Sequence, residues 1–122
     1  MSQERVAKHR EHYIRTAPGD YPEFFKKVGL RDKMCCRVTG DAVGPFSAHH
    51  LLSRTRHPEY SIDVDNGVLI LRSIHKQFHR EFPNTTFTPN DFVEWVHTNY
   101  GVDLQIPSRI LQVKHAQANT SD

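Results

Sequence analysis

An apolar pattern near the middle of the chain constrains the fold more than any other feature. Five apolar residues recur there at intervals of three and four: Val68, Leu71, Ile74, Phe78 and Phe82. This spacing places them on one face of a helix, and Pro83 would end that helix. We therefore predict a helix that starts near Asn66 and buries this face in a core.

Further helices are predicted on both sides of this central segment. Thr88 is a favourable N-cap, a proline follows it at the first helical position, and Gly101 would end a helix over residues 89–100. Before the central segment we expect two more helices, a short one from Pro22 to Leu30 and a basic, weakly docked one over residues 3–16. The chain is therefore predicted to be rich in helix.

Strand-like sequence lies between these helices. Residues 34–38 and 44–52 have the composition of strands, and Thr39-Gly40-Asp41 supplies a turn between them. The polar stretch of residues 53–65 would be a surface loop, because it has no helical or strand periodicity. Since 122 residues fit one domain, we predict a single α+β domain, with a β-hairpin and the central helix as its core and other helices around it.

The overall charge does not identify a partner, but its distribution is uneven. The formal net charge is +2. Residues 1–57 carry a net charge of +5 and residues 58–122 a net charge of −3. The first half is therefore the better candidate for contact with an anion such as nucleic acid.

Membrane insertion and secretion are not expected from this sequence. The longest aliphatic run, Val68 to Leu71, is far shorter than the roughly 20 residues of a membrane-spanning helix, and the first residues contain no apolar signal region. Cys35 and Cys36 are adjacent and do not make a disulfide framework. We therefore expect a cytoplasmic protein without a membrane partner.

Histidine is the one residue type that is unusually frequent, with nine in the chain. His75 and His79 are four residues apart, so they share one face of the predicted central helix. His49 and His50 lie late in the predicted strand and would point to opposite sides of it. A metal ion could thus be held between strand and helix, with one of these two strand histidines left free for acid–base chemistry.

Three short motifs carry a resemblance to a known family. They are Ala48-His49-His50-Leu51-Leu52, Asp65-Asn66-Gly67-Val68-Leu69-Ile70-Leu71 and Ile74-His75-Lys76-Gln77-Phe78-His79. In order and spacing they resemble the HNH endonucleases, which belong to the ββα-metal or His-Me finger nucleases. The resemblance covers residues 35–82, and the segments that follow, residues 84–86 and 92–95, resemble the tail of small phage-encoded HNH proteins.

The resemblance implies a role for each matching residue. His50 corresponds to the general base, and Asn66 to the residue that braces the loop that orients it. His49 and His75 correspond to metal ligands, and His79 to a further ligand that some members have. The family uses one divalent metal ion, here Mg, Mn, Zn or Ni, to hydrolyse phosphodiester bonds in double-stranded DNA and leave 5′-phosphate and 3′-hydroxyl ends.

The family pattern also suggests how the chain is organised. Residues 34–83 would form the HNH core, after a basic helical extension over residues 1–33 and before a helical segment over residues 84–115 and a disordered tail over 116–122. Many HNH proteins hold a structural zinc with two CxxC pairs. The matching segments here begin with Cys35 and Leu71 and lack those pairs, so we expect no such zinc and place the cysteines in the core.

Basic side chains are candidates for contact with DNA phosphates. Arg54 and Arg56 lie in the loop between the predicted general base and the central helix, close to where a scissile phosphate would be. The other candidates are Arg5, Lys8, Lys26 and Lys27, for which the simpler alternative is a solvated face. One catalytic site cuts one strand, so a double-strand break would need a homodimer or two successive events.

Two other functions remain open at this point. The chain could be a nucleic-acid-binding module that keeps the fold and a structural metal but does not cut. It could also cut RNA or branched DNA with the same chemistry. His50 separates the first alternative from an enzyme, because a protein that does not cut has no need for an uncoordinated histidine beside a metal.

Overall fold

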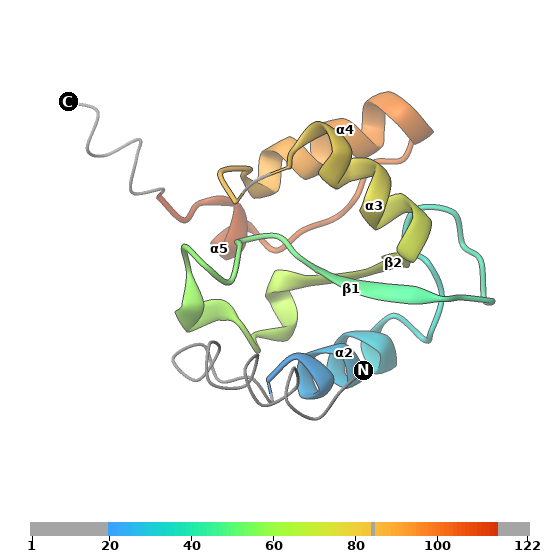
Figure 1. Cartoon of the computed structure of the whole chain (residues 1–122), viewed down its shortest axis with the longest axis horizontal. Coiled ribbons are helices and arrows are strands. Elements are labelled where there is room, and N and C mark those ends of the chain that lie inside the picture. The colour runs from blue at the N-terminus through green and yellow to red at the C-terminus, as the bar shows by residue number, and fades with distance from the viewer. Residues whose placement is uncertain (1–19, 84, 115–122) are drawn as a thin grey trace, which may run out of the picture.

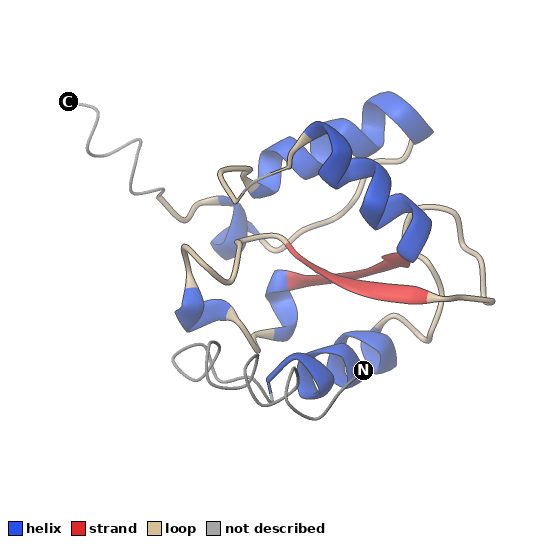
Figure 2. Ribbon diagram, viewed as in Figure 1, coloured by secondary structure: helices blue, strands red, loops and turns tan. Residues whose placement is uncertain are grey.

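The computed structural model describes residues 20–83 and 85–114. The helix predicted over residues 3–16, with Arg5 and Lys8, lies outside the described residues, as does the predicted tail over 116–122. The described elements are, in chain order, α2 (Asp20–Arg31), β1 (Phe46–His50), η2 (Pro58–Tyr60), η3 (Val64–Asn66), β2 (Gly67–Leu71), α3 (Arg72–Glu81), α4 (Pro89–Tyr100) and α5 (Ser108–Leu111). Figures 1 and 2 show them around one hairpin.

The hairpin joins β1 to β2 as an antiparallel pair. Phe46 lies opposite Leu71, and His50 lies opposite Gly67. The α+β class is confirmed, since a two-stranded antiparallel sheet is followed directly by a helix and flanked by others. No helix within the described ranges is long and apolar enough to cross a membrane.

The prediction that residues 34–38 form the first strand of the hairpin is wrong. These residues form turns, because Lys33 and Met34 adopt left-handed backbone angles, with φ of 57° and 52°. The backbone N–H of Cys36 donates to the carbonyl of Asp41 at 2.8 Å and closes a turn instead of pairing along a strand. His49 and His50 therefore lie on the first strand of the hairpin.

The predicted central helix is correct only in its second part. Its first part is β2, and α3 begins at Arg72. Val68, Leu69 and Ile70 are all completely buried, so the strand has no polar face and shows no alternation in its sequence. A short apolar run of this kind is compatible with either a buried strand or a buried helix, and the periodicity alone did not separate them.

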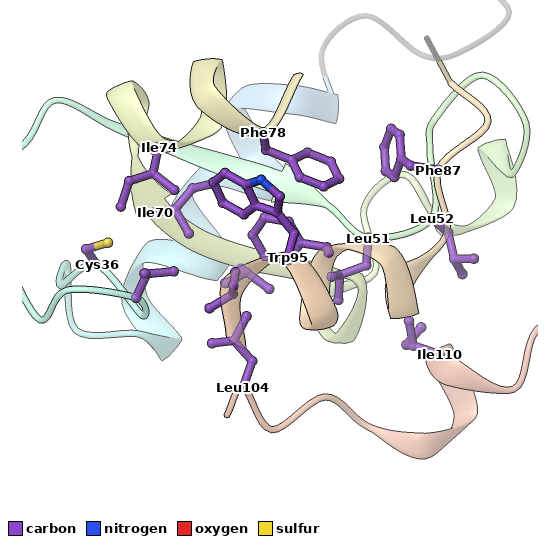
Figure 3. Close-up of a cluster of buried hydrophobic side chains, with 14 residues drawn as sticks. Cys36, Leu51, Leu52, Ile70, Ile74, Phe78, Phe87, Trp95, Leu104 and Ile110 are labelled. Atoms are coloured by element: carbon purple, nitrogen blue, oxygen red, sulfur yellow. The ribbon is translucent and has the colours of Figure 1, made fainter. Parts of the chain in front are cut away.

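The hairpin is covered on both faces, which explains the burial of β2. In Figure 1, α2 lies on one side of the hairpin, and α3 and α4 lie on the other. On the α2 side, Phe24 and Val28 pack against Ala48 and Leu69. The larger core lies on the other side, where Ile70, Ile74, Phe78 and Trp95 meet (Figure 3).

Local sequence defines α4 well. The predicted N-cap is confirmed, because the Thr88 hydroxyl accepts from the backbone N–H of Asp91 while the Asp91 carboxylate accepts from that of Thr88. Gly101 ends the helix in the left-handed conformation, with φ of 67°. Phe92 and Val96 are completely buried, so α4 holds its inner face against the core beside α3.

Candidate metal centre

Three histidines from two elements converge beside the hairpin. His49 lies near the end of β1, and His75 and His79 lie one turn apart on α3. One ring nitrogen from each lies within 4.8 Å of the others. The Nε2 atoms of His75 and His79 are 3.2 Å apart. The structure therefore brings together the three residues that the sequence singled out, and this cluster could hold a metal ion.

His49 is the most constrained of the three. It is 1% exposed, and neither of its ring nitrogens has a hydrogen-bond partner among residues 20–83 and 85–114. Its ring is packed against Phe78, Phe87 and Phe92, with centroid distances of 5.3, 5.6 and 4.2 Å. An unsatisfied buried polar atom costs about 1–3 kcal/mol, and a cation that accepts the lone pair of one nitrogen would offset part of that cost.

The hydrogen bonding of His79 determines which of its nitrogens is available. Its Nδ1 lies 3.1 Å from the carbonyl oxygen of Phe82. Because a carbonyl only accepts, Nδ1 must carry the proton and donate it. The lone pair is then on Nε2, the atom that faces His75. This is the outer hydrogen bond that orients histidine ligands in metal sites.

Burial keeps the imidazoles of His49 and His75 neutral at neutral pH. The pKa of His49 is lowered well below 6.5, first by desolvation and then by the neighbouring His75 and His79. Desolvation, and after it the neighbouring His79 and His50, lower the pKa of His75 to about 4. A metal ligand must be unprotonated, so both side chains are in the required form without any shift from the metal itself.

The chemistry of the donors fits a divalent transition metal. The cluster offers three imidazole nitrogens and includes no carboxylate from the described part of the chain. Imidazole suits Zn, Ni and similar ions, whereas Mg strongly prefers oxygen ligands. Three protein ligands leave coordination positions for water or substrate, as in catalytic zinc sites. We therefore name His49, His75 and His79 as the residues that would hold the ion.

His50 is directed differently from its neighbour, as expected for adjacent strand residues. Its Nε2 lies 2.9 Å from the carbonyl oxygen of Ser61, so Nε2 carries the proton and donates it. The lone pair is then on Nδ1, for which the described residues provide no hydrogen-bond partner. Desolvation lowers the pKa of His50 to about 4, the Ser61 carbonyl opposes this, and the charge of Arg54 adds to the decrease.

Asn66 closes the loop that carries Ser61. Its side chain is completely buried, its Oδ1 accepts from Leu52 N at 2.7 Å, and its Nδ2 donates to the carbonyls of Leu52 and Tyr60, both at 3.1 Å. The carbonyl of Tyr60 directly precedes the Ser61 peptide that binds His50. Asn66 thus connects the backbone after β1 to the turn that precedes Ser61.

One pocket is lined by the three histidines of the cluster and by His50. It has a volume of about 270 Å³ and is also lined by Tyr21, Ala48, Ser53, Arg54, Thr55, Thr85 and Phe87. Of the basic residues predicted to contact DNA phosphates, Arg54 lines this pocket. Arg56 is not part of this lining, and Lys26 and Lys27 are exposed on α2 away from it.

Comparisons of the chain with protein-family models, with curated proteins and with solved structures give no match. The resemblance to the HNH endonucleases therefore depends on the three sequence motifs alone. The four-cysteine zinc site of some members cannot form here, because the whole chain has two cysteines. Cys36 is buried as expected, and its sulfur accepts from the backbone N–H groups of Thr39 and Leu71, both at 3.4 Å.

Sequence reasoning did not find every residue that shapes the site. Phe24 stacks on His50, with ring centroids 4.0 Å apart and ring planes at 8°. Ser61 and Phe82 contribute through their backbone carbonyls. A carbonyl is present at every residue and leaves no signal in the sequence, and Phe24 was recognisable only as part of a buried helix face.

Proposed function

We propose that this protein is a metal-dependent endonuclease that hydrolyses phosphodiester bonds in DNA with a histidine general base. One observation carries the proposal. His50 lines the same pocket as the three-histidine cluster, its Nε2 is bonded to the Ser61 carbonyl, and its Nδ1 is left without a protein partner in the described structure. A site that only bound a metal would have no use for this fourth imidazole.

His50 would remove a proton from the attacking water through Nδ1. At neutral pH the imidazole is unprotonated, since burial lowers its pKa to about 4. A bound phosphate would bring a negative charge close to the ring and raise this pKa toward the range in which proton transfer is most effective. The Ser61 carbonyl would stabilise the charged ring, because it accepts a hydrogen bond from Nε2–H in both forms.

His49, His75 and His79 would hold the metal, which would supply positive charge to offset the negative charge that develops on the phosphate, and a solvent water would give the departing 3′ oxygen its proton. Arg54 would hold the phosphate by charge-assisted hydrogen bonds from the wall of the pocket. Asn66 would keep the loop in place. The products would carry a 5′ phosphate and a 3′ hydroxyl.

The test is nicking of supercoiled plasmid by the purified protein with Mg, Mn, Ni or Zn, and with EDTA. The His50→Ala variant should bind the metal as wild type does but cut about 10²- to 10⁴-fold more slowly, which is the usual contribution of a general base. His97→Ala is the matched control, because His97 is exposed and pairs with Asp103. Unchanged cutting by His50→Ala would contradict the mechanism.

The second candidate is a nucleic-acid-binding module with a structural metal. The observation in its favour is His49, whose buried and unsatisfied ring would be stabilised by a metal whether or not catalysis occurs. Binding of DNA without cutting, in wild type and in His50→Ala alike, would establish it. Single-stranded RNA and a four-way DNA junction in the same assay test whether another nucleic acid is preferred, and light scattering tests for a homodimer.

A further inference from the structure

Within the described part of the chain His50 has a single hydrogen bond, and one hydrogen bond does not define the orientation of an imidazole. The contact between Nε2–H and the Ser61 carbonyl leaves the ring able to turn about the axis of that bond. A turned ring would change the direction of Nδ1 relative to the pocket that His50 lines. A second contact, on the face of the ring, is needed to fix it.

Phe24 of α2 supplies that contact. Its ring lies parallel to the imidazole, with a centroid distance of 4.0 Å and an angle of 8° between the planes, and it is completely buried. Such a face-to-face contact opposes rotation of the imidazole, because a turned ring would collide with Phe24. The two restraints are perpendicular: Ser61 acts in the plane of the imidazole and Phe24 acts on its face.

Gly67 makes room for this stack. It is the residue opposite His50 in the hairpin, and a Cβ there would lie 2.6 Å from Cζ of Phe24 and 2.4 Å from Cγ2 of Val28. Both distances are too short for real contacts, so a larger residue would force the side chains of Phe24 and Val28 to shift. The glycine that follows Asn66 is thus explained by the approach of Phe24 to His50.

The helix that carries Phe24 is anchored to the hairpin at both ends. Near its start, the Tyr21 hydroxyl accepts a hydrogen bond from the backbone N–H of Ala48 at 3.2 Å. At its end, Arg31 donates to the carbonyls of Val64 at 2.6 Å and Gly67 at 2.7 Å. These hydrogen bonds fix the position of α2, and with it the Phe24 ring, relative to the strand.

We propose that Phe24 is a positioning residue for His50: seated over Gly67, it holds the imidazole in one orientation against the wall of the metal pocket, with Nε2 bonded to Ser61 and Nδ1 left available. The inference rests on the proposed function, in which His50 is the proton acceptor. It adds α2, which lies outside the hairpin and α3, to the machinery of the site.

The first test is independent of activity. In NMR spectra, the ring C–H resonances of His50 are identified by their absence in His50→Ala. These resonances should show the upfield shift of nuclei that lie above an aromatic face. Phe24→Leu should abolish that shift, and Gly67→Ala should reduce it. Val28→Ala is the control, because Val28 packs in the same cluster without a ring contact to His50. An unchanged shift in Phe24→Leu would overturn the proposal.

The second test separates positioning from general stability. In the nicking assay kcat of Phe24→Leu should fall by about 10- to 100-fold, the range expected when a catalytic group is misplaced by about 1 Å, while KM and zinc affinity stay as in wild type. Val28→Ala should keep its kcat. In the Phe24→Leu background, Gly67→Ala should cause a smaller further loss of kcat than it causes in wild type, since part of its effect acts through the Phe24 ring.

The outcomes distinguish the two proposals. If wild type cuts no substrate but the His50 shift responds to Phe24→Leu and not to Val28→Ala, the proposed nuclease function fails and the positioning by Phe24 holds. If wild type cuts and the Phe24→Leu and Val28→Ala variants lose kcat to the same extent, the loss reflects stability alone. The positioning role is then overturned.

Discussion

The Nε2 atoms of His75 and His79 face each other at 3.2 Å across one turn of α3. Since Nδ1 of His79 donates to the Phe82 carbonyl, its Nε2 can only accept. Without a cation, the Nε2–H of His75 must donate the hydrogen bond between the two rings. With a cation, both lone pairs would be directed to the same charge, and the unsatisfied ring of His49 would be close enough to join them.

This relationship predicts the effect of removing a ligand. His79→Gln should weaken zinc binding by at least the roughly 10- to 100-fold that loss of an outer hydrogen bond alone costs in metal sites. His97→Ala should bind zinc as wild type does, because His97 is exposed and outside the cluster. Isothermal titration calorimetry measures both, and equal affinities would remove His79 from the ligand set.

Metal removal should lower thermal stability. Zinc at about 100 times its Kd should add about 2.7 kcal/mol to the free energy of unfolding, which corresponds to a rise in Tm of roughly 10–20 °C for a domain of this size. EDTA should reverse the rise, and His49→Ala should show none. Differential scanning fluorimetry measures the shift. A zinc-dependent rise that persists in His49→Ala would place the ion elsewhere.

Asn66 should matter for stability as well as for the site. Asn66→Ala would leave the backbone N–H and carbonyl of Leu52 and the carbonyl of Tyr60 without their buried partner. We expect a loss of at least about 2 kcal/mol in the free energy of unfolding, measured with urea. Asn99→Ala, at an exposed position, should lose less than about 1 kcal/mol. A similar small loss at Asn66 would argue against its role as a brace.

Asp32 should make stability depend on pH in acid. Burial raises its pKa, but hydrogen bonds from Arg31 and Leu69 N–H and the charges of Arg31 and Arg37 outweigh this and hold the pKa below 3.8. Its stabilising contribution is therefore complete above the unfolded-state pKa of about 3.9 and is lost as pH falls through the lowered folded-state value.

Urea unfolding of wild type and Asp32→Asn between pH 7 and pH 3 measures this contribution. Wild type should be the more stable protein at pH 7, and the difference should shrink as the carboxylate becomes protonated. Asp41→Asn is the control, because Asp41 is exposed. A difference that stays constant over the whole range would show that Asp32 acts through packing and not through charge.

Arg54 should contribute to DNA binding through charge. In a His50→Ala background that does not cut, Arg54→Gln should weaken binding of a 20-base-pair duplex and reduce the slope of log K against log salt concentration by about 1. Lys33→Gln is the control, since Lys33 follows the end of α2 that is remote from Tyr21 and the pocket. Fluorescence anisotropy measures both. An unchanged slope would remove Arg54 from the phosphate contacts.

Local sequence was enough wherever an interaction is made between near neighbours in the chain. The N-cap at Thr88 and the end of α4 at Gly101 were predictable, because a cap is formed within four residues. The shared face of His75 and His79 followed from helical spacing. The opposite directions of His49 and His50 followed from the alternation of a strand.

Tertiary structure decided the contacts between distant segments. The run at Val68 could have been helix or strand, and it became β2 because α2 and the larger core bury it from both sides. The partner of that strand is β1, whereas residues 34–38 form turns and give it one backbone hydrogen bond, from the N–H of Arg37 to the carbonyl of Leu69 at 2.8 Å. Phe24 meets His50 because Gly67 has no side chain. This contact depends on three separate segments of the chain, and no periodicity of the sequence predicts it. The sequence thus determined which chemical groups are present and how each is directed on its own element, whereas packing between elements decided which of them meet.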